Sequence, residues 1–493
     1  MNQSSSGLLW TVFFITSACS TGSGDSIARR TVRATCNATY WHDDGSKSTS
    51  SDCTGAELNT RQPDGAGQWS GLATFAKTKD GYAGSAQEGT YLLGAKYTAY
   101  SYWEYFETSA DSFDLGYDVA GRSDVQWPSS STPVTFNVDG LDPWDVNDYL
   151  QLTSSGCHAW GEIAAPTKTA SFATGASSGQ VAFDWYGTGK GLPDGSKGDA
   201  VYVYQGKSQT IPGGTFSYQA VSRAAQLPAS FRVVSGVSQT QSVSLEAVSQ
   251  TGSLSIDWRL SEFERYAPDI HPNSTPKTHM LLVDAEPHTL TGIPSMVSRT
   301  PDMMILSLPS GTPDQDITTL TYGQFLPSFW VEFRQVHYKV GLSITAPGAA
   351  TATELIGTIG RRDPLPASNG AVLPAITPPR SPMINGIDAF QSPAGVGTTP
   401  MFSWSAPALG TATHYVIEIA SVVNSNGATA FEPVAYLTTV SSAIRMPPGP
   451  LQAGTQYVGY LTAYFVTSDA PETAPYRYSI PNAWATTLLT FNP

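Results

Sequence analysis

The chain has 493 residues, of which 40% are hydrophobic and 11% aromatic, so it can bury more than one core. Only 13% of the residues are charged, about half the usual share, and the formal net charge is −14. This negative balance opposes binding to phosphate backbones and to anionic membrane surfaces, so we expect no nucleic-acid partner. The 45 glycines and 35 prolines are dispersed, which favours short strands joined by turns. We therefore predict an all-β fold, with several antiparallel β-sandwich domains in series and little helix.

Residues 1–26 have the features of an export signal followed by a tether. The apolar run at 8–15 has the length of a signal peptide and is too short to span a bilayer as a mature helix. Small residues and then Cys19 follow this run, and the arrangement resembles a bacterial lipobox, in which the cysteine is acylated. The resemblance implies lipidation of Cys19, export to the outer membrane or cell surface, and membrane contact only through that anchor. An ordinary secretion signal is the alternative.

The other three cysteines carry two further predictions. Cys36 and Cys53 bracket a polar loop with little core of its own. A disulfide between them would remove denatured-state entropy worth about 3 kcal/mol for a loop of this size. Cys157 stands next to His158, but no acidic or amide residue that would orient the histidine is identifiable. We interpret Cys157 as a small buried thiol.

Three parts follow the tether. Residues 27–124 contain "EGTYLLGAKY", and Gly89 and Tyr91 within it resemble the signature of transthyretin-like modules of bacterial surface proteins. That resemblance implies an antiparallel sandwich without catalytic residues of its own. Residues 125–370 contain many short alternating runs, such as "DAVYVYQ", which predict a central β-rich domain or two subdomains. Residues 371–382 are rich in proline, which predicts a semi-rigid connector.

Aromatic residues crowd the strand predicted between residues 97 and 106. If side chains alternate, one face carries Tyr100, Tyr102, Glu104 and Phe106, and the other carries Trp103 and Tyr105. An aromatic face beside a carboxylate can stack on sugar rings, whereas strand aromatics more often form core. Because both faces are aromatic, we expect at least one of them to be buried. Tyr100, Tyr102 and Phe106 are the candidate ligand-facing aromatics.

The segment "THMLLVDAEPHT" is the candidate metal or acid–base site. Asp284, Glu286 and His288 occupy alternate positions, so on a strand they would share one face. Two carboxylates and an imidazole at this spacing could hold a divalent metal or transfer protons. Pro287 interrupts the strand, so a polar strand end entering a turn explains the same residues.

Residues 383–493 resemble a fibronectin type III domain. "MFSWSAPALGTATHYVIEIA" is similar to the early strands of that family, with Trp404 inward on one strand and Tyr415 opening the alternation on the next. "LQAGTQYVGYLTAY" is similar to the late corner of the family, with Leu451 before the turn and Tyr457 opening a strand. The resemblance implies that the Tyr457 hydroxyl bonds to the backbone a few residues upstream. Taken whole, the chain resembles large exported bacterial lipoproteins that end in such a domain.

The sequence contains no nucleophile elbow, no zinc-binding histidine pair on a helix and no phosphate-binding loop. We therefore predict an exported, lipid-anchored cell-envelope protein whose non-catalytic sandwich modules serve binding or display. Its expected partners are envelope or matrix components or a glycan, and we expect no cofactor. The alternative is a carbohydrate-acting hydrolase or carbohydrate-binding protein with its site in the central domain. A hydrolase needs two carboxylates facing one cleft, and the sequence offers Asp257, Glu262, Asp284 and Glu286.

Overall fold

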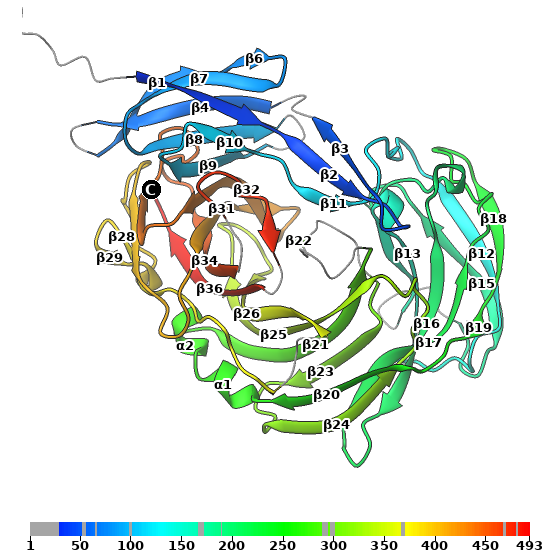
Figure 1. Cartoon of the computed structure of the whole chain (residues 1–493). Helices are drawn as coiled ribbons and strands as arrows, with labels where there is room; N and C mark the ends of the chain where they lie inside the picture. The colour runs from blue at the N-terminus through cyan, green and yellow to red at the C-terminus, as the bar shows by residue number, and fades with distance from the viewer. Residues whose placement is uncertain are drawn as a thin grey trace, which may run out of the picture.

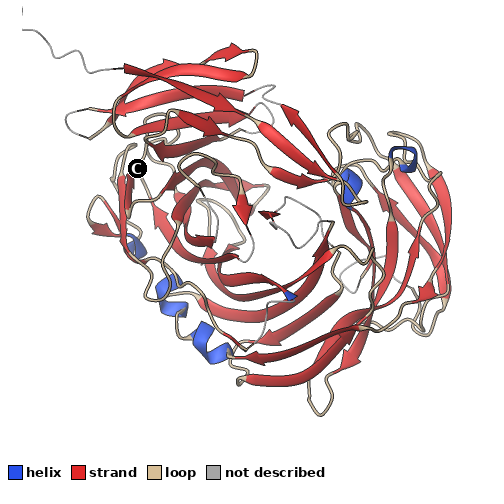
Figure 2. Cartoon of the chain, viewed as in Figure 1, coloured by secondary structure: helices blue, strands red, loops and turns tan. Residues whose placement is uncertain are grey.

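Strands dominate the structure, and the few helices are short (Figure 2). The computed structural model describes residues 29–51, 56–64, 67–97, 101–165, 172–188, 190–287, 294–295, 301–365, 370–466, 470–479 and 482–493. The helices in these ranges are α1 (Leu260–Glu264), α2 (Ala267–Ile270), η1 (Ser155–Cys157), η2 (Gly195–Lys197) and η4 (Ala389–Gln391). The predicted all-β fold is confirmed. Across the ranges given above, no helix has the length and apolar character needed to cross a membrane.

One long sheet runs through the N-terminal, C-terminal and central parts of the chain (Figure 1). Its first half, in order of neighbours, is β5 (Trp69–Thr74), β4 (Ala56–Pro63), β8 (Tyr91–Tyr97), β9 (Trp103–Thr108), β32 (Ala428–Thr439), β31 (His414–Ser425), β34 (Tyr457–Val466) and β36 (Asn482–Phe491). It continues as β26 (Thr353–Pro364), β25 (Val331–Ile344), β21 (Thr275–Glu286), β23 (Met304–Pro309), β17 (Ser217–Gln226), β16 (Tyr202–Thr210), β13 (Tyr149–Ser154) and β14 (Ala159–Ala164), with β19 (Glu246–Ala247) also beside β17.

Two seams in this sheet join strands that are far apart in the sequence. At the first seam, β9 pairs with β32 in parallel, and Trp103 lies beside Ala435. At the second, β26 pairs with β36 in antiparallel orientation, and Ile359 lies beside Ala485. Backbone hydrogen bonds therefore connect the N-terminal, C-terminal and central parts edge to edge, in an order that differs from their order in the chain.

Smaller sheets cover the long sheet and enclose the cores. The N-terminal cover is β10 (Ser112–Asp114), β1 (Arg29–Thr35), β7 (Gly81–Gln87) and β6 (Ala76–Thr78). The two central covers are β15 (Ser178–Asp184), β12 (Pro133–Asp139) and β18 (Gln239–Ser244), and then β24 (Gln315–Tyr322), β20 (Gly252–Trp258) and β27 (Ala371–Val372). The C-terminal cover is β29 (Ile387–Asp388), β28 (Arg380–Ile384), β30 (Met401–Ser405) and β33 (Ala443–Arg445). The short pair β22 (Pro294–Ser295) and β35 (Tyr478–Ser479) stands apart from these covers.

Alternating side chains explain why these covers form. In β12, "PVTFNVD", Val134, Phe136 and Val138 are buried while the residues between them are not. In β20, "GSLSIDW", Leu254, Ile256 and Trp258 follow the same rule. A strand with one apolar face must bury that face against a second layer, which gives the two-layer arrangement seen around the long sheet.

The C-terminal part confirms the predicted bond of the corner tyrosine. The backbone N–H of Gln452 donates to the hydroxyl of Tyr457 at 2.9 Å. The Tyr457 ring stacks near Phe491, with ring centroids 5.6 Å apart. Trp404 packs edge-on against Tyr415 at 5.1 Å, inside the same sandwich. The hydroxyl thus fixes the turn before β34 while the ring contributes to the core.

The segment predicted as a connector, 371–382, is packed into the molecule. Ile376 and Thr377 are fully buried, and the backbone N–H of Thr377 donates a hydrogen bond to the Leu409 carbonyl at 3.1 Å. The hydroxyl of Thr487 donates to the Pro379 carbonyl at 2.6 Å. The stretch predicted as a semi-rigid connector is thus largely buried, and its prolines, Pro374, Pro378, Pro379 and Pro382, are among its buried residues.

The long sheet curves round, and a hairpin from the N-terminal part reaches the strands at its far end (Figure 1). This hairpin is β2 (Asn37–Trp41) and β3 (Lys47–Ser51), extended by β11 (Asp118–Ala120). At its turn, the Asp43 carboxylate oxygen accepts the Ala200 N–H at 2.9 Å, and Trp330 donates its ring N–H to the Asp43 carbonyl at 3.2 Å. Arg122 binds Asp199 in the same region with two hydrogen bonds, at 2.9 and 3.0 Å.

Candidate functional site

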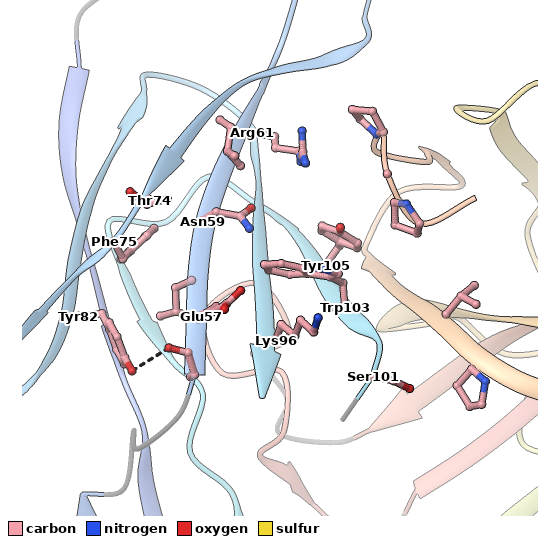
Figure 3. Close-up of a pocket in the computed structure, with 18 of the residues that line it drawn as sticks. Glu57, Asn59, Arg61, Thr74, Phe75, Tyr82, Lys96, Ser101, Trp103 and Tyr105 are labelled. Carbon is pink, nitrogen blue, oxygen red and sulfur yellow. Dashed lines mark hydrogen bonds between the residues drawn. The ribbon is translucent and has the colours of Figure 1, made fainter. Parts of the chain in front are cut away.

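A cleft of about 1150 Å³ lies where the N-terminal strands meet the C-terminal part. One wall comes from β4, β5, β8 and β9, and the other from residues 431–434 of β32 and the turn at 448–450. In Figure 3 the side chains of Asn59, Arg61, Lys96 and Trp103 project from the N-terminal strands toward the same space. The cleft exists only because the β9–β32 seam brings these two walls together.

Strand register places the lining residues of the N-terminal wall on one face. Glu57 of β4 lies opposite Lys96 of β8. Asn59 lies opposite Gly94, and Gly94 lies opposite Tyr105 of β9. A Cβ atom on Gly94 would stand 2.7 Å from Asn59 Oδ1 and 3.1 Å from a ring carbon of Tyr105. Glycine at this position therefore allows the polar Asn59 and the aromatic Tyr105 to lie side by side in the wall.

Trp103 provides a flat apolar surface in this wall. Its ring is half-buried and stacks against Tyr105, with centroids 5.9 Å apart and planes 19° apart. Tyr105 is buried, and burial raises the pKa of its hydroxyl to about 12, so this support stays neutral. The Lys96 ammonium lies 5.9 Å from the centroid of the Trp103 ring. An aromatic face held in this way can stack on another flat, partly apolar ring.

Polar atoms with unused hydrogen-bonding capacity surround the aromatic surface. Asn59 Oδ1 and Arg61 Nε are buried and have no hydrogen-bond partner within the described ranges. Buried polar atoms in proteins are nearly always bonded, to protein, to water or to a ligand. The wall therefore combines a stacking surface with donors and acceptors available to a bound molecule.

The predicted ligand-facing aromatics lie largely elsewhere. Phe106 is 3% exposed and packs against Phe113 at 5.4 Å in the N-terminal core. Tyr102 is half-buried, and its ring lies 4.9 Å from that of Tyr436. Tyr100 lies outside the described residues. The prediction that Phe106 faces a ligand is corrected: its side chain packs in the N-terminal core, because the cover sheet of β1 and β7 lies over it.

Asp284 and Glu286, two of the three metal candidates, bind an arginine. Arg362 donates to Asp284 Oδ1 at 2.8 Å and to Glu286 Oε1 at 2.7 Å. Its guanidinium also lies over the ring of Phe333, 4.3 Å from the centroid. The positive charge beside the two carboxylates is thus supplied by the chain itself. His288 lies outside the described residues, within which no group of three or more His, Cys, Asp or Glu side chains could hold a metal ion.

The remaining acidic candidates for a hydrolase are also paired with arginines. Asp257 binds Arg259 at 2.8 Å, and Glu262 binds Arg265 at 3.0 Å. Neither residue lines the cleft, and nor do Asp284 and Glu286. The four carboxylates proposed from the sequence are therefore held by three different arginines.

The cysteines divide as follows. Cys157 is a free thiol and fully buried, and burial raises its pKa well above the ordinary range, so the predicted buried thiol is confirmed. Cys36 is buried and disulfide-bonded. Its predicted partner Cys53 lies outside the described residues, as does Cys19, so both the pairing and the lipidation stay predictions.

The chain matches no family model and no curated protein. Trp103, Asn59 and Arg61 are residues of the candidate site that the reasoning from sequence did not select. Alternation placed Trp103 on the other face of its strand from Tyr102 and Phe106, which were predicted to face a ligand. Asn59 and Arg61 belong to the strand "AELNTRQP", whose sequence contains no motif that indicates a binding site.

Proposed function

We propose that this protein is a non-catalytic binding protein of the cell envelope, and that the cleft between its N-terminal strands and C-terminal part binds a glycan. One observation supports the proposal most directly: the half-buried Trp103 lines the same cleft as Asn59 and Arg61, whose buried polar atoms have no partner in the described structure. Sugar rings present an apolar face and a rim of hydroxyls, so they match a stacking surface bordered by donors and acceptors.

Replacing Trp103 with alanine is expected to weaken glycan binding by at least about 10-fold, because a central aromatic anchor usually dominates a binding site. The protein is screened against a glycan array, and the best ligand is then titrated by calorimetry against wild type and variant. Trp127→Ala is the matched control, since Trp127 is 54% exposed and does not line the cleft. If wild-type protein binds no glycan on the array, the proposed function is wrong.

We also propose export and a lipid anchor at Cys19, on the basis of the apolar run and the small residues that precede the cysteine. Substitution of Cys19 with serine is expected to move the protein from the membrane fraction to the soluble fraction, because the acylation site is lost. Fractionation of cells expressing each form, followed by immunoblotting, measures this. A matched Cys157→Ser variant should stay with the membranes. Unchanged fractionation of the Cys19 variant would contradict the anchor.

The two family resemblances remain part of this proposal. A fibronectin type III-like C-terminal domain is supported by its two facing sheets and by the Tyr457 hydrogen bond. A transthyretin-like N-terminal module is supported by the sandwich that β1, β7 and β10 form with β4, β8 and β9. Sandwich modules of this kind hold binding surfaces on a rigid scaffold, which is consistent with a role in binding or display.

A further inference from the structure

Arg61 lies at an irregularity of its sheet. Thr60 pairs with Ala73, whereas Gln62 pairs with Ser70, so two residues of β5 stand opposite the single Arg61. These two residues are Gly71, with a φ of 61°, and Leu72, which is 56% exposed and lines the cleft. Such an arrangement is a β-bulge with glycine in the left-handed conformation. Bulges of this kind bend a strand and re-aim side chains, and here the bulge lies at the wall of the cleft.

The guanidinium of Arg61 is a cation without a protein counter-charge in the described part of the chain. Its Nε atom is buried and unpartnered, and its cross-strand neighbour on β8 is the apolar Leu92. The partly buried Arg122 and the buried Arg362, by contrast, each bind carboxylates through two or more hydrogen bonds. Arginine is the side chain best shaped to bind a planar carboxylate with two parallel hydrogen bonds.

Arg61 and Lys96 are the two cations among the lining residues, and they stand at opposite ends of the N-terminal wall. Glu57 is exposed and lies opposite Lys96 in the strand register, and the Lys96 ammonium lies near the Trp103 ring. Glu432 is exposed on β32. Leu92 of β8 lies between Arg61 of β4 and Glu107 of β9 in the sheet. The Glu107 carboxylate accepts a hydrogen bond from the Thr439 hydroxyl. None of these carboxylates is within ion-pair distance of Arg61 in the described structure.

The separation between Arg61 and Trp103 sets the size of the ligand. Arg61 is four residues from Glu57 on β4. Glu57 lies opposite Lys96 of β8, and β8 pairs in turn with β9, which carries Trp103. With a rise of about 3.4 Å per residue and about 4.8 Å between strands, the two Cα atoms are about 17 Å apart. The two strand positions are further apart than the width of one sugar ring, so a glycan that lies along the wall from one to the other has more than one ring.

We propose that the cleft binds an acidic oligosaccharide of the uronic-acid class. A carboxylate of one sugar residue binds the guanidinium of Arg61, and the ring of another sugar residue stacks on Trp103. This inference rests on the proposed glycan-binding function and adds its charge specificity. The apolar Leu72 at the rim and the stacking surface of Trp103 contact ring faces, while Arg61 selects the charge.

The test compares one sugar chain in two charge states. Oligogalacturonides of four to six residues and their methyl-esterified counterparts are titrated by calorimetry against wild-type protein, Arg61→Gln, Trp103→Ala and Arg33→Gln. Wild type is expected to bind the acid form about 10- to 100-fold more tightly than the ester, the usual range for a charged hydrogen-bond pair. Arg61→Gln should abolish this preference, and added salt should reduce it. Arg33→Gln is the control, because Arg33 is exposed on β1, away from the cleft.

Each other outcome has a distinct meaning. If both forms bind equally to wild type and Trp103→Ala weakens both, the cleft binds glycans but the charge specificity is wrong. If the preference for the acid form survives in Arg61→Gln, the assigned role of Arg61 is likewise overturned. If neither form binds and the glycan array is also blank, the proposed function fails together with this inference.

Discussion

Replacement of Arg362 with methionine is expected to lower the free energy of unfolding by about 3–5 kcal/mol, the usual cost of removing one partner from a buried ion pair. The side chains of Asp284 and Glu286 are 9% and 1% exposed, and without the guanidinium that now binds them both would be left buried with no cationic partner at this position. Methionine retains apolar contact with Phe333, so the loss reports mainly on charge. Urea unfolding followed by tryptophan fluorescence measures the effect.

Arg361→Met is the matched control for this experiment. The Arg361 side chain is 24% exposed, and its partner Asp363 would keep a second arginine, Arg334, at 2.9 Å. We therefore expect a loss below about 1 kcal/mol for this variant. Adding Asp284→Asn and Glu286→Gln to Arg362→Met should restore much of the stability, because the buried charges are then removed. Equal losses for the two arginine variants would contradict the electrostatic explanation.

Asp43 is expected to make the protein less stable as the pH rises from about 4 to about 7. Burial, helped by the neighbouring Asp199 carboxylate, raises the pKa of Asp43 from 3.8 to about 7. In this interval the unfolded chain ionises Asp43 while the folded protein keeps it protonated, so folding is increasingly opposed as the pH rises. A difference of about 3 pKa units corresponds to about 4 kcal/mol at the upper limit. Asp43→Asn cannot ionise, so it should remove this contribution.

The effect should be concentrated where the β2–β3 hairpin meets the central strands. The Ala200 amide donates to the Asp43 carboxylate at 2.9 Å, so its protection against hydrogen exchange should fall between about pH 4 and pH 7 in wild type but not in Asp43→Asn. Urea unfolding at pH 4, 5.5, 7 and 8 gives the matching stabilities. The control is Asp44→Asn. Asp44 is exposed, and hydrogen bonds from Ser46 lower its pKa, so its contribution is already complete by pH 5. Identical pH slopes for wild type and Asp43→Asn would refute the assignment.

The candidate site shows where prediction from sequence stopped. Alternation correctly assigned Phe106 and Trp103 to opposite faces of β9, but both faces are aromatic. The choice between them depends on which face the cover sheet of β1 and β7 packs against. Likewise, Asp284 and Glu286 were correctly placed on one face, yet their partner Arg362 lies 76 residues beyond Glu286 on a neighbouring part of the sheet. Contacts over such separations leave no mark in local spacing.

The sequence by itself determined what depends on neighbouring residues: the all-β character, the alternation within strands, and the bond of the Tyr457 hydroxyl five residues upstream. Only the tertiary structure decided that β9 pairs with β32 and that a cleft with Trp103 and Arg61 forms at this seam. The physical reason is that strand pairing is made by backbone hydrogen bonds, for which every residue has an acceptor and every residue except proline a donor. The identity of a strand's neighbour is therefore set by the packing of whole layers and by no single motif.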